Sequence, residues 1–476
     1  MLFFGKNKKN SRNTVDNSTT NYTVDDEKEV RQESFYLGVE DTFRLKDTSD
    51  IVVVGKVHGT IMKGSAFYIT NMGDDDAPVY LSTVVGLEVD RTPVNVATDT
   101  FVAVRIDGGS KLNIKTGSVL FTRDISTKDV HNAYIYALGD GYISFRNMKL
   151  EQADYDKMSL TDLAEVRRLY KGLVDIKKEQ ETEEIAAFNK RIFDTIGKNM
   201  SSKILTSKEL YTVINKKTGE PHMVSHTFES DDGNYITTPP DIILITKAYL
   251  EVWKQQFNPD KYDIIKIENG EDGKGIYNFL GSAFYINGAC GVTVLFSDYS
   301  IDAGMLVEKP DYSNIPRISV PVTNPDLERW LLLMGQLDQP KTENEKKIYS
   351  IYLNHMIMEL AKAQFIIPMK VDGEMEPPDE NGNTTLKKDT TIAIATQKGK
   401  GERAAIRMYT DWKRFRMVYS EADGWSGLIQ PISGMIETYD CVINDTEFSS
   451  AGCYVDKHFY EEYIKKHVIE NGHLDN

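Results

Sequence analysis

The sequence predicts a multidomain protein made of a β-barrel, a helical linker and two copies of one α/β (α+β) domain. Its 476 residues exceed what one ordinary core holds, since a domain typically has about 100–200 residues. Short alternating apolar segments fill residues 35–123, and helical spacing replaces them over 159–200. After residue 200 the same order of predicted strands and helices occurs twice. A barrel followed by a duplicated domain accounts for these observations.

The predicted units follow one another along the chain. We expect a disordered tail over 1–33, a β-barrel over 34–130, a connecting strand and helices over 131–200, a first α/β domain over 201–312 and a second over 325–470. The tail is polar and rich in Asn, Thr, Ser and Lys, so it cannot bury enough apolar surface to offset the loss of chain entropy.

Six segments predict the strands of the barrel. Each is rich in β-branched or aromatic residues and is bounded by turn signals: FYLGVE, IVVVGKVHG, AFYIT, VYLSTVVGLEV, FVAVRI and SVLFTR. Gly59 and Gly64 are expected to reverse the chain between the second and third segments, because glycine accepts backbone angles that a Cβ excludes. Val54 and Lys56 fall on one face of the second segment, so the alternation of apolar and polar residues is imperfect there.

Three consecutive aspartates, Asp74, Asp75 and Asp76, lie in the insert NMGDDDAP between two predicted strands. A calcium site is not expected here, because the spacing lacks the alternation and the terminal glutamate of an EF-hand. We therefore predict a solvated hairpin tip.

Two amphipathic helices are predicted over 159–200. Ser159 precedes the first helix, and Asp162 follows three residues later, which is a pattern typical of helix starts. Apolar residues recur every three or four positions in both helices: Leu163, Val166, Tyr170 and Leu173, then Ile185, Phe188, Ile192 and Ile196. These stripes favour packing against a neighbouring domain.

The remainder of the chain repeats itself. ELYTVI and AQFIIPM each predict a strand after a helix, and DIILITKAYLEVW and RAAIRMYTDWKRF each predict a strand that leads into a helix. Three pairs of anchor residues align the copies: Tyr211 with Phe365, Thr246 with Thr410, and Gly304 with Gly452. The two threonines are expected to be helix N-caps. The copies differ most in the turn regions 215–240 and 370–404, and variable loops on a rigid sheet are a common binding surface.

The barrel segment resembles the second domain of translational GTPases such as elongation factor Tu. The resemblance rests on VEDTFRL, VVVGKVHGTIMKG, YLSTVVGLEVDRTPVNVATDTFVAVRI and TGSVLF, in that order. It implies a six-stranded barrel. The chain departs from the family because it lacks the phosphate-binding pattern G-x-x-x-x-G-K-[ST], which GEDGKG at 270–275 does not supply. Neither binding nor hydrolysis of GTP is therefore expected.

The two C-terminal copies resemble the SseB (enhanced serine sensitivity) family. AQFIIPM, RMYTDW and CVINDTEFSSAGCYV carry this resemblance, which covers about 200–310 and 340–465. Asn444 and Asp445 stand where the family has Asn-Pro, and LFSD replaces that turn in the first copy. The family implies no established chemistry, so it contributes no catalytic residue.

Charge and cysteine content exclude several functional classes. The formal net charge of −16 repels phosphate backbones and anionic lipid, so neither nucleic acid nor membrane is an expected partner. Cys290, Cys441 and Cys453 form no CxxC pair and are expected to be buried in a reducing cytosol. No apolar run approaches the length needed to span a bilayer. A cytoplasmic location follows as the prediction.

No catalytic, cofactor-binding or metal-binding residue is predicted. His222 and His226 stand four residues apart with Glu229 nearby, but turn signals on both sides indicate an exposed strand, where this spacing is too long for one ion. Cys290 is expected to be buried and inert, and Ser426 lacks the G-x-S-x-G context of a nucleophile.

Aromatic residues near the second copy's predicted helix also suggest no ligand. Trp412, Phe415 and Tyr419 fit the buried stripe of a helix better than a base-stacking platform.

The expected function is non-enzymatic protein binding or scaffolding, with contact to the protein partner through the variable loops, 372–384 above all. The alternative is a translation-linked factor whose barrel contacts a ribosome, a tRNA or a GTPase partner and has no GTPase activity of its own. An enzyme with an unrecognised pocket is the third possibility.

Overall fold

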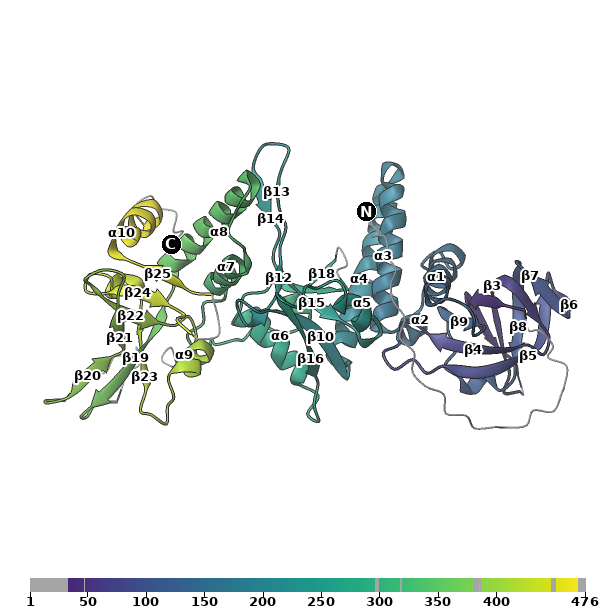
Figure 1. Ribbon diagram of the computed structural model, residues 1–476, viewed down its shortest axis with the longest axis horizontal. Helices are drawn as coiled ribbons and strands as arrows, with labels where there is room; N and C mark the ends of the chain where they lie inside the picture. The colour runs from purple at the N-terminus through teal and green to yellow at the C-terminus, as the bar shows by residue number, and fades with distance from the viewer. Residues whose placement is uncertain are drawn as a thin grey trace, which may run out of the picture.

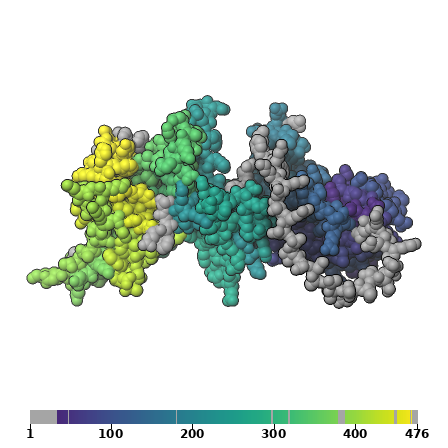
Figure 2. Space-filling model, viewed as in Figure 1, coloured from purple at the N-terminus to yellow at the C-terminus, as the bar shows by residue number. Residues whose placement is uncertain are grey.

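The computed structural model describes residues 33–46, 48–295, 299–316, 319–377, 379, 385, 387–446 and 451–469. Figure 1 shows three bodies in a row: the barrel at one end, a first α/β unit in the middle and a second α/β unit at the other end. Figure 2 shows that this row forms an elongated body with notches between its parts. The predicted tail lies outside the described residues, apart from Glu33.

The N-terminal body is a closed six-stranded antiparallel β-barrel, as predicted. Its strands pair in the order β1-β9-β4-β5-β8-β3, and β1 also pairs with β3 to close the barrel. They are β1 (Phe35–Gly38), β3 (Ile51–Met62), β4 (Ala66–Asn71), β5 (Tyr80–Val89), β8 (Phe101–Ile106) and β9 (Ser118–Phe121). The short strands β2 (Asp41–Arg44), β6 (Thr92–Val94) and β7 (Val96–Thr98) extend it. Phe35, Val53 and Val57 are among its fully buried residues.

The predicted reversal from Gly59 to Gly64 is wrong at Gly59. Strand β3 continues through Gly59 to Met62, and the chain turns only at Gly64. Gly59 has φ +82°, and a Cβ there would lie 2.2 Å from the carbonyl oxygen of Ser34. This glycine therefore lets β3 pass the start of β1, and it is not part of the turn.

The connecting strand expected within 131–200 is a helix. Helix α1 (Thr127–Leu138) is capped by Ser126 and continues into a π-helix, η2 (Gly139–Phe145), before α2 (Gln152–Lys157). The segment HNAYIYALGDGYISF looks β-prone because of its aromatic and β-branched residues. Its buried residues nevertheless recur at helical spacing, and α1 packs on β1 and β9 of the barrel. Tertiary packing overrides local propensity here.

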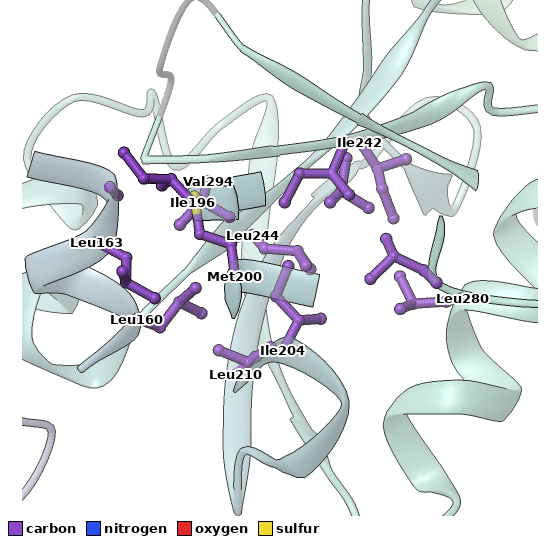
Figure 3. Packing of buried hydrophobic residues seen from close by; sticks show 14 of the residues in the cluster. Leu160, Leu163, Ile196, Met200, Ile204, Leu210, Ile242, Leu244, Leu280 and Val294 are labelled. Carbon is purple, nitrogen blue, oxygen red and sulfur yellow. The ribbon is translucent and has the colours of Figure 1, made fainter. Parts of the chain in front are cut away.

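Helices α3 (Leu160–Ile176) and α4 (Glu183–Thr206) belong to the first α/β unit. Ser159 and Asp162 form the predicted capping box at the start of α3. Figure 3 shows Leu163 of α3 and Met200 of α4 packed with Leu210 and Ile242 of the sheet in one apolar core. The first unit therefore begins near Ser159, earlier than the predicted boundary at residue 201.

The first unit has a mixed sheet between two helical layers. Its strands pair in the order β16-β10-β15-β17-β18, with β15 and β17 parallel and the other pairs antiparallel. They are β10 (Glu209–Asn215), β15 (Asp241–Ile245), β16 (Tyr262–Glu268), β17 (Gly291–Val294) and β18 (Ser300–Asp302), with the short strands β11 (Glu220–Pro221) and β12 (Met223–Val224). Helix α6 (Gly275–Tyr285) joins α3 and α4 on one face, and α5 (Leu250–Lys254) lies on the other.

The second unit repeats this plan. Helices α7 (Pro325–Gln336) and α8 (Glu343–Lys362) precede strands β19 (Phe365–Asp372), β20 (Thr391–Ile394), β21 (Thr396–Lys398) and β22 (Ala404–Met408). Helix α9 (Trp412–Val418), β23 (Ser426–Gln430), β24 (Asp440–Ile443), β25 (Cys453–Val455) and α10 (Lys457–Phe459) follow, and a π-helix, η8 (Tyr460–Ile469), ends the described chain.

The strand order of the second unit matches that of the first. It runs β23-β19-β22-β24-β25, with β22 and β24 parallel. Strands β19 and β22 meet where Ile366 and Tyr409 exchange two backbone hydrogen bonds of 2.9 Å. In each unit one short strand pairs with the second strand of this order and another pairs with the third. These are β11 and β12 in the first unit, and β20 and β21 in the second. The predicted duplication is therefore visible in the topology.

Pairing registers test the three predicted anchor pairs. Thr246 and Thr410 are equivalent, because each follows the strand that pairs in parallel. Tyr211 pairs with Ile245 as Ile366 pairs with Tyr409, so the equivalent of Tyr211 is Ile366, one residue from the predicted Phe365.

The third anchor pair is wrong. Gly304 follows β18, whereas Gly452 precedes β25, and the pairing of β18 and β25 makes Ile301 equivalent to Val455. The Ala-Gly pairs misled the alignment because they flank opposite ends of equivalent strands.

The two threonines are not N-caps by side-chain bonding. Asp411 caps α9 and accepts a hydrogen bond from the backbone N–H of Arg414. Thr246 precedes a 3₁₀ turn (Lys247–Tyr249) without a side-chain cap bond, and its hydroxyl instead lies 2.7 Å from that of Thr161.

Candidate functional site

The histidine pair does not form a metal site. His222 lies between β11 and β12 with its ring 4.9 Å from that of Tyr262, and burial lowers the pKa of His222. His226 is exposed at the base of the hairpin β13 (Thr227–Glu229) and β14 (Tyr235–Thr237), and Glu229 bonds to the hydroxyl of Tyr235. The described part of the chain holds no group of three His, Cys, Asp or Glu side chains suited to a metal ion. His222 is half-buried rather than on the exposed face that we expected.

Cys290 and Ser426, the two nucleophiles considered from the sequence, lie beside or within strands of the two sheets. Burial raises the pKa of the Cys290 thiol, and Cys290 is half-buried beside the start of β17. Ser426 begins strand β23 and bonds to the carbonyl oxygen of Met369. Cys441 is buried, Cys453 is half-buried, and all three cysteines are free thiols.

The aromatic residues of α9 are packed as predicted. Phe415 and Tyr419 are buried, and Trp412 packs against them on the face of the sheet opposite α7 and α8. Their rings contact one another edge-on or stacked, so this cluster is a second small core.

The three aspartates of the insert lie where the barrel meets the first unit, which corrects the prediction of a solvated hairpin tip. Asp75 and Asp76 contact the first unit directly. Asp74 forms an ion pair with Lys115. Asp75 accepts a hydrogen bond of 3.1 Å from the backbone N–H of Ala248, at the start of the 3₁₀ turn before α5. Asp76 pairs with Lys247 of the same turn. The partner of Asp76 lies 171 positions away in the sequence, and that of Asp75 lies 173 positions away. Local sequence therefore gives no sign of these two contacts.

A buried cation lies at the centre of the contact between the barrel and the first unit. The ammonium of Lys115, 5% exposed, lies 2.6 Å from Asp162 of α3, and the Tyr134 hydroxyl of α1 donates to the other oxygen of Asp162. Burial lowers the pKa of Lys115, but the charges of Asp162 and Asp74 outweigh burial and hold the pKa above its ordinary value. We call Asp74, Lys115, Tyr134 and Asp162 the barrel junction.

Helix α7 joins the two α/β units. Leu327 and Leu331 belong to the core of the second unit, whereas Leu332 and Leu333 belong to the core of the first. Gln336 at its C-terminal end makes two hydrogen bonds to the backbone of Met223 in β12. The helix is thus shared by both cores.

A buried polar cluster lies next to α7 at this contact, which we call the inter-unit junction. Glu220 and Asn287 come from the first unit, and the remaining members come from α7 and the second unit: Glu328, Thr410, Asp411, Lys413, Arg414 and Asn444. The Arg414 guanidinium, 3% exposed, lies 2.6 Å from Asp411, 2.8 Å from Glu328 and 3.0 Å from the side-chain oxygen of Asn287. The Lys413 ammonium contacts both oxygens of Glu220 at 2.6 and 2.9 Å.

Glu328 is the most deeply buried carboxylate of the inter-unit junction. Its Oε2 accepts hydrogen bonds from the Thr410 hydroxyl at 2.9 Å and the Asn444 amide at 2.8 Å. Its Oε1 faces Arg414 at 2.8 Å but makes no well-aligned hydrogen bond within the described residues. Burial raises the pKa of Glu328 to about 7, against the opposing charge of Arg414.

The outward face of the barrel over β2, β3 and β8 carries exposed phenylalanines among charged side chains. Arg105 pairs with Val52 on this face, and Asp41 pairs with Val54. Cross-strand pairing places Phe43 beside Val52, Val54 beside Ala103, and Lys56 beside Phe101. Phe145 of η2 lies against Phe101 with ring centroids 6.2 Å apart. Phe43 is 51%, Phe101 45% and Phe145 69% exposed. We call this surface the outer face and define it as Phe43, Val52, Val54, Phe101, Ala103 and Phe145.

The sequence contained one sign of the outer face. The imperfect alternation at Val54 places an apolar side chain on the face that it shares with Lys56, away from the core residues Val53 and Val57. Phe145 could not have been placed there from sequence, because it reaches Phe101 from a helix 44 positions later in the chain.

Comparison with known proteins adds no family assignment. None of the models of known protein families matches the chain, and none of the curated proteins compared with it matches either. Over the described residues, no helix combines the length and the apolar character needed to cross a membrane.

Proposed function

We propose that this chain is a non-enzymatic, cytoplasmic protein-binding or scaffolding protein, with a translation-factor-type barrel followed by two SseB-like units. The observation that carries the proposal is the outer face. Three exposed phenylalanines lie there, over strands whose opposite side already fills the barrel core, and two of them, Phe101 and Phe145, are in ring contact. Exposed aromatic side chains gathered on one face of a protein are typical of a site where another protein binds.

The two junctions support a scaffolding role. Buried ionic groups fix the barrel to the first unit and the first unit to the second, and α7 contributes to both α/β cores. A partner bound at the barrel is therefore held in a set position relative to the two sheets.

Affinity capture with the full-length protein tests this proposal. Phe43→Glu combined with Phe101→Glu places two charges on the outer face, and these exposed changes leave the melting temperature within a few degrees. Proteins recovered from the native cell by the wild type should be missing with this double variant. Leu81→Glu is the matched control, because Leu81 is 68% exposed on β5 outside the outer face. Equal recovery by the double variant and the control would refute binding through the outer face.

A translation-linked factor is the second candidate. The closed six-stranded barrel favours it, because that is the architecture implied by the resemblance to the second domain of translational GTPases. In that case the barrel would contact a ribosome, a tRNA or a GTPase partner, and the chain would not bind GTP. Salt separates the candidates: binding to RNA weakens steeply as salt rises, whereas apolar protein binding does not.

A further inference from the structure

The inter-unit junction contains one more carboxylate than its cations balance. Lys413 is paired with Glu220, and Arg414 is paired with Asp411 at 2.6 Å. Glu328 shares Arg414 and is the remaining carboxylate. A buried charge without its own counterion is costly, so proteins either pair such a group or bind it in its neutral form.

The two oxygens of Glu328 have different surroundings. Oε2 is occupied by two donors, Thr410 and Asn444, whereas Oε1 makes no aligned hydrogen bond among the described residues. The charged or titratable groups that interact with Glu328 come from several elements: Asp411 and Arg414 from the start of α9, Glu220 from β11 and Cys453 from β25. Lys413 of α9 pairs with Glu220. On α7 itself, Asp326 and Arg329 pair with each other, and Arg329 donates to the carbonyl oxygen of Gly288.

We propose that the contact between the two α/β units is a proton-dependent junction, which holds when Glu328 is neutral and loosens when Glu328 ionises. The proposal does not depend on the identity of any binding partner. Below the transition the junction carries two balanced ion pairs and a neutral acid. Above the pH of this transition, the ionised carboxylate of Glu328 competes for Arg414. The contacts of that guanidinium with Glu220 and Asn287 of the first unit then weaken.

The direction of the effect follows from linkage. The pKa of Glu328 is raised from 4.5 to about 7 in the folded chain. Its contribution to stability is therefore fully present below the unfolded value and is lost as pH rises to the folded value. Between these two values the folded state holds one more proton than the unfolded state, so this group raises the unfolding equilibrium constant roughly tenfold per pH unit.

Infrared spectroscopy of the full chain tests the protonation directly. The wild type should show a carboxylic acid band that persists to about pH 6 and disappears near neutral pH, whereas the ordinary exposed carboxylates have already ionised. The part of the band that disappears near neutral pH should be missing in Glu328→Gln and retained in Asp326→Asn, which removes an exposed carboxylate from the same helix. Asp241, whose pKa burial raises to about 6, should contribute equally in all three proteins. A wild type without a band that titrates near neutral pH would overturn the proposal, and this measurement needs no variant to fold.

Two further measurements test the link to the junction. Urea unfolding of wild type and Asp326→Asn should become easier as pH rises from about 5 to about 7, relative to Glu328→Gln. Amide hydrogen exchange in β11 and α9, corrected for its intrinsic pH dependence, should accelerate above neutral pH relative to β3 of the barrel. Two outcomes would contradict a proton-dependent junction. One is that the stability of all three proteins changes in parallel with pH, and the other is that amide exchange accelerates equally in β11, α9 and β3.

Discussion

The two junctions of the molecule balance charge differently. At the barrel junction Lys115 holds two carboxylates, Asp162 and Asp74, and the side chain of Asp74 is 23% exposed. At the inter-unit junction Arg414 also holds two carboxylates, Asp411 and Glu328, but neither is more than 2% exposed. Water can therefore stabilise the excess negative charge at the first junction, whereas at the second junction only a proton can.

This difference shows that the number of ion pairs in a buried cluster does not by itself determine whether its carboxylates are all ionised. Each junction contains one cation between two carboxylates. Access of water decides whether the additional charge is tolerated or has to be neutralised.

Removing the cation of the inter-unit junction should have the largest effect. Arg414→Met keeps the approximate volume but leaves Asp411 and Glu328 buried without their counterion. We expect the free energy of unfolding to fall by about 3–5 kcal/mol, measured by urea denaturation at neutral pH. Arg416→Met is the control, because Arg416 is partly exposed on the same helix and pairs with the exposed Glu421. A loss for Arg414→Met that equals the control would show that the cluster contributes nothing to folding.

Removing the cation of the barrel junction should have a smaller effect. Lys115→Met leaves Asp162 buried without its counterion, but Asp74 can turn its carboxylate toward water. We expect a loss of about 3 kcal/mol in the free energy of unfolding. Lys111→Met is the control on the same surface loop, because Lys111 is exposed. If Lys115→Met proves more damaging than Arg414→Met, the comparison of the two junctions by water access is wrong.

The equivalent threonines sharpen the comparison between the two α/β units. Thr410 bonds to Glu328 and Asn444, whereas Thr246 meets only the hydroxyl of Thr161 through its side chain. Thr410→Val should cost about 2 kcal/mol of unfolding free energy and Thr246→Val about 1 kcal/mol, because each removes hydrogen bonds to buried groups. Thermal unfolding of the two variants measures the difference. Equal losses would mean that the polar cluster adds nothing at this position.

Local patterns predicted the elements whose residues interact with near neighbours. The barrel strands follow from alternation, and the start of α3 follows from Ser159 and Asp162. Helix α1 was missed, because the aromatic residues that suggest a strand are buried against a barrel that local sequence does not show. The duplication was found, but two of its three anchors were displaced because similar residues, such as the Ala-Gly pairs, occur at inequivalent positions.

Both junctions remained beyond sequence reasoning, and only Val54 gave a sign of the outer face. Glu328 contacts Asn444 across 116 positions, and Arg414 contacts Glu220 across 194. Charged residues at such separations are ordinary surface residues in the sequence. Only the folded arrangement shows that they are buried together.

Partner binding by two full-length variants tests the central claim, that the outer face of the barrel binds another protein. The prediction from the sequence placed partner contact in the variable loops, 372–384 above all, and residues 378 and 380–384 lie outside the described residues. Calorimetry with the recovered partner should therefore compare the double variant Phe43→Glu and Phe101→Glu with a variant in which a short Gly/Ser turn replaces residues 372–384. We predict that the double variant loses at least about 100-fold in affinity, as expected for central apolar contacts of an interface, and that the loop variant stays within about twofold of the wild type. Undiminished binding by the double variant together with loss of binding by the loop variant would contradict the account.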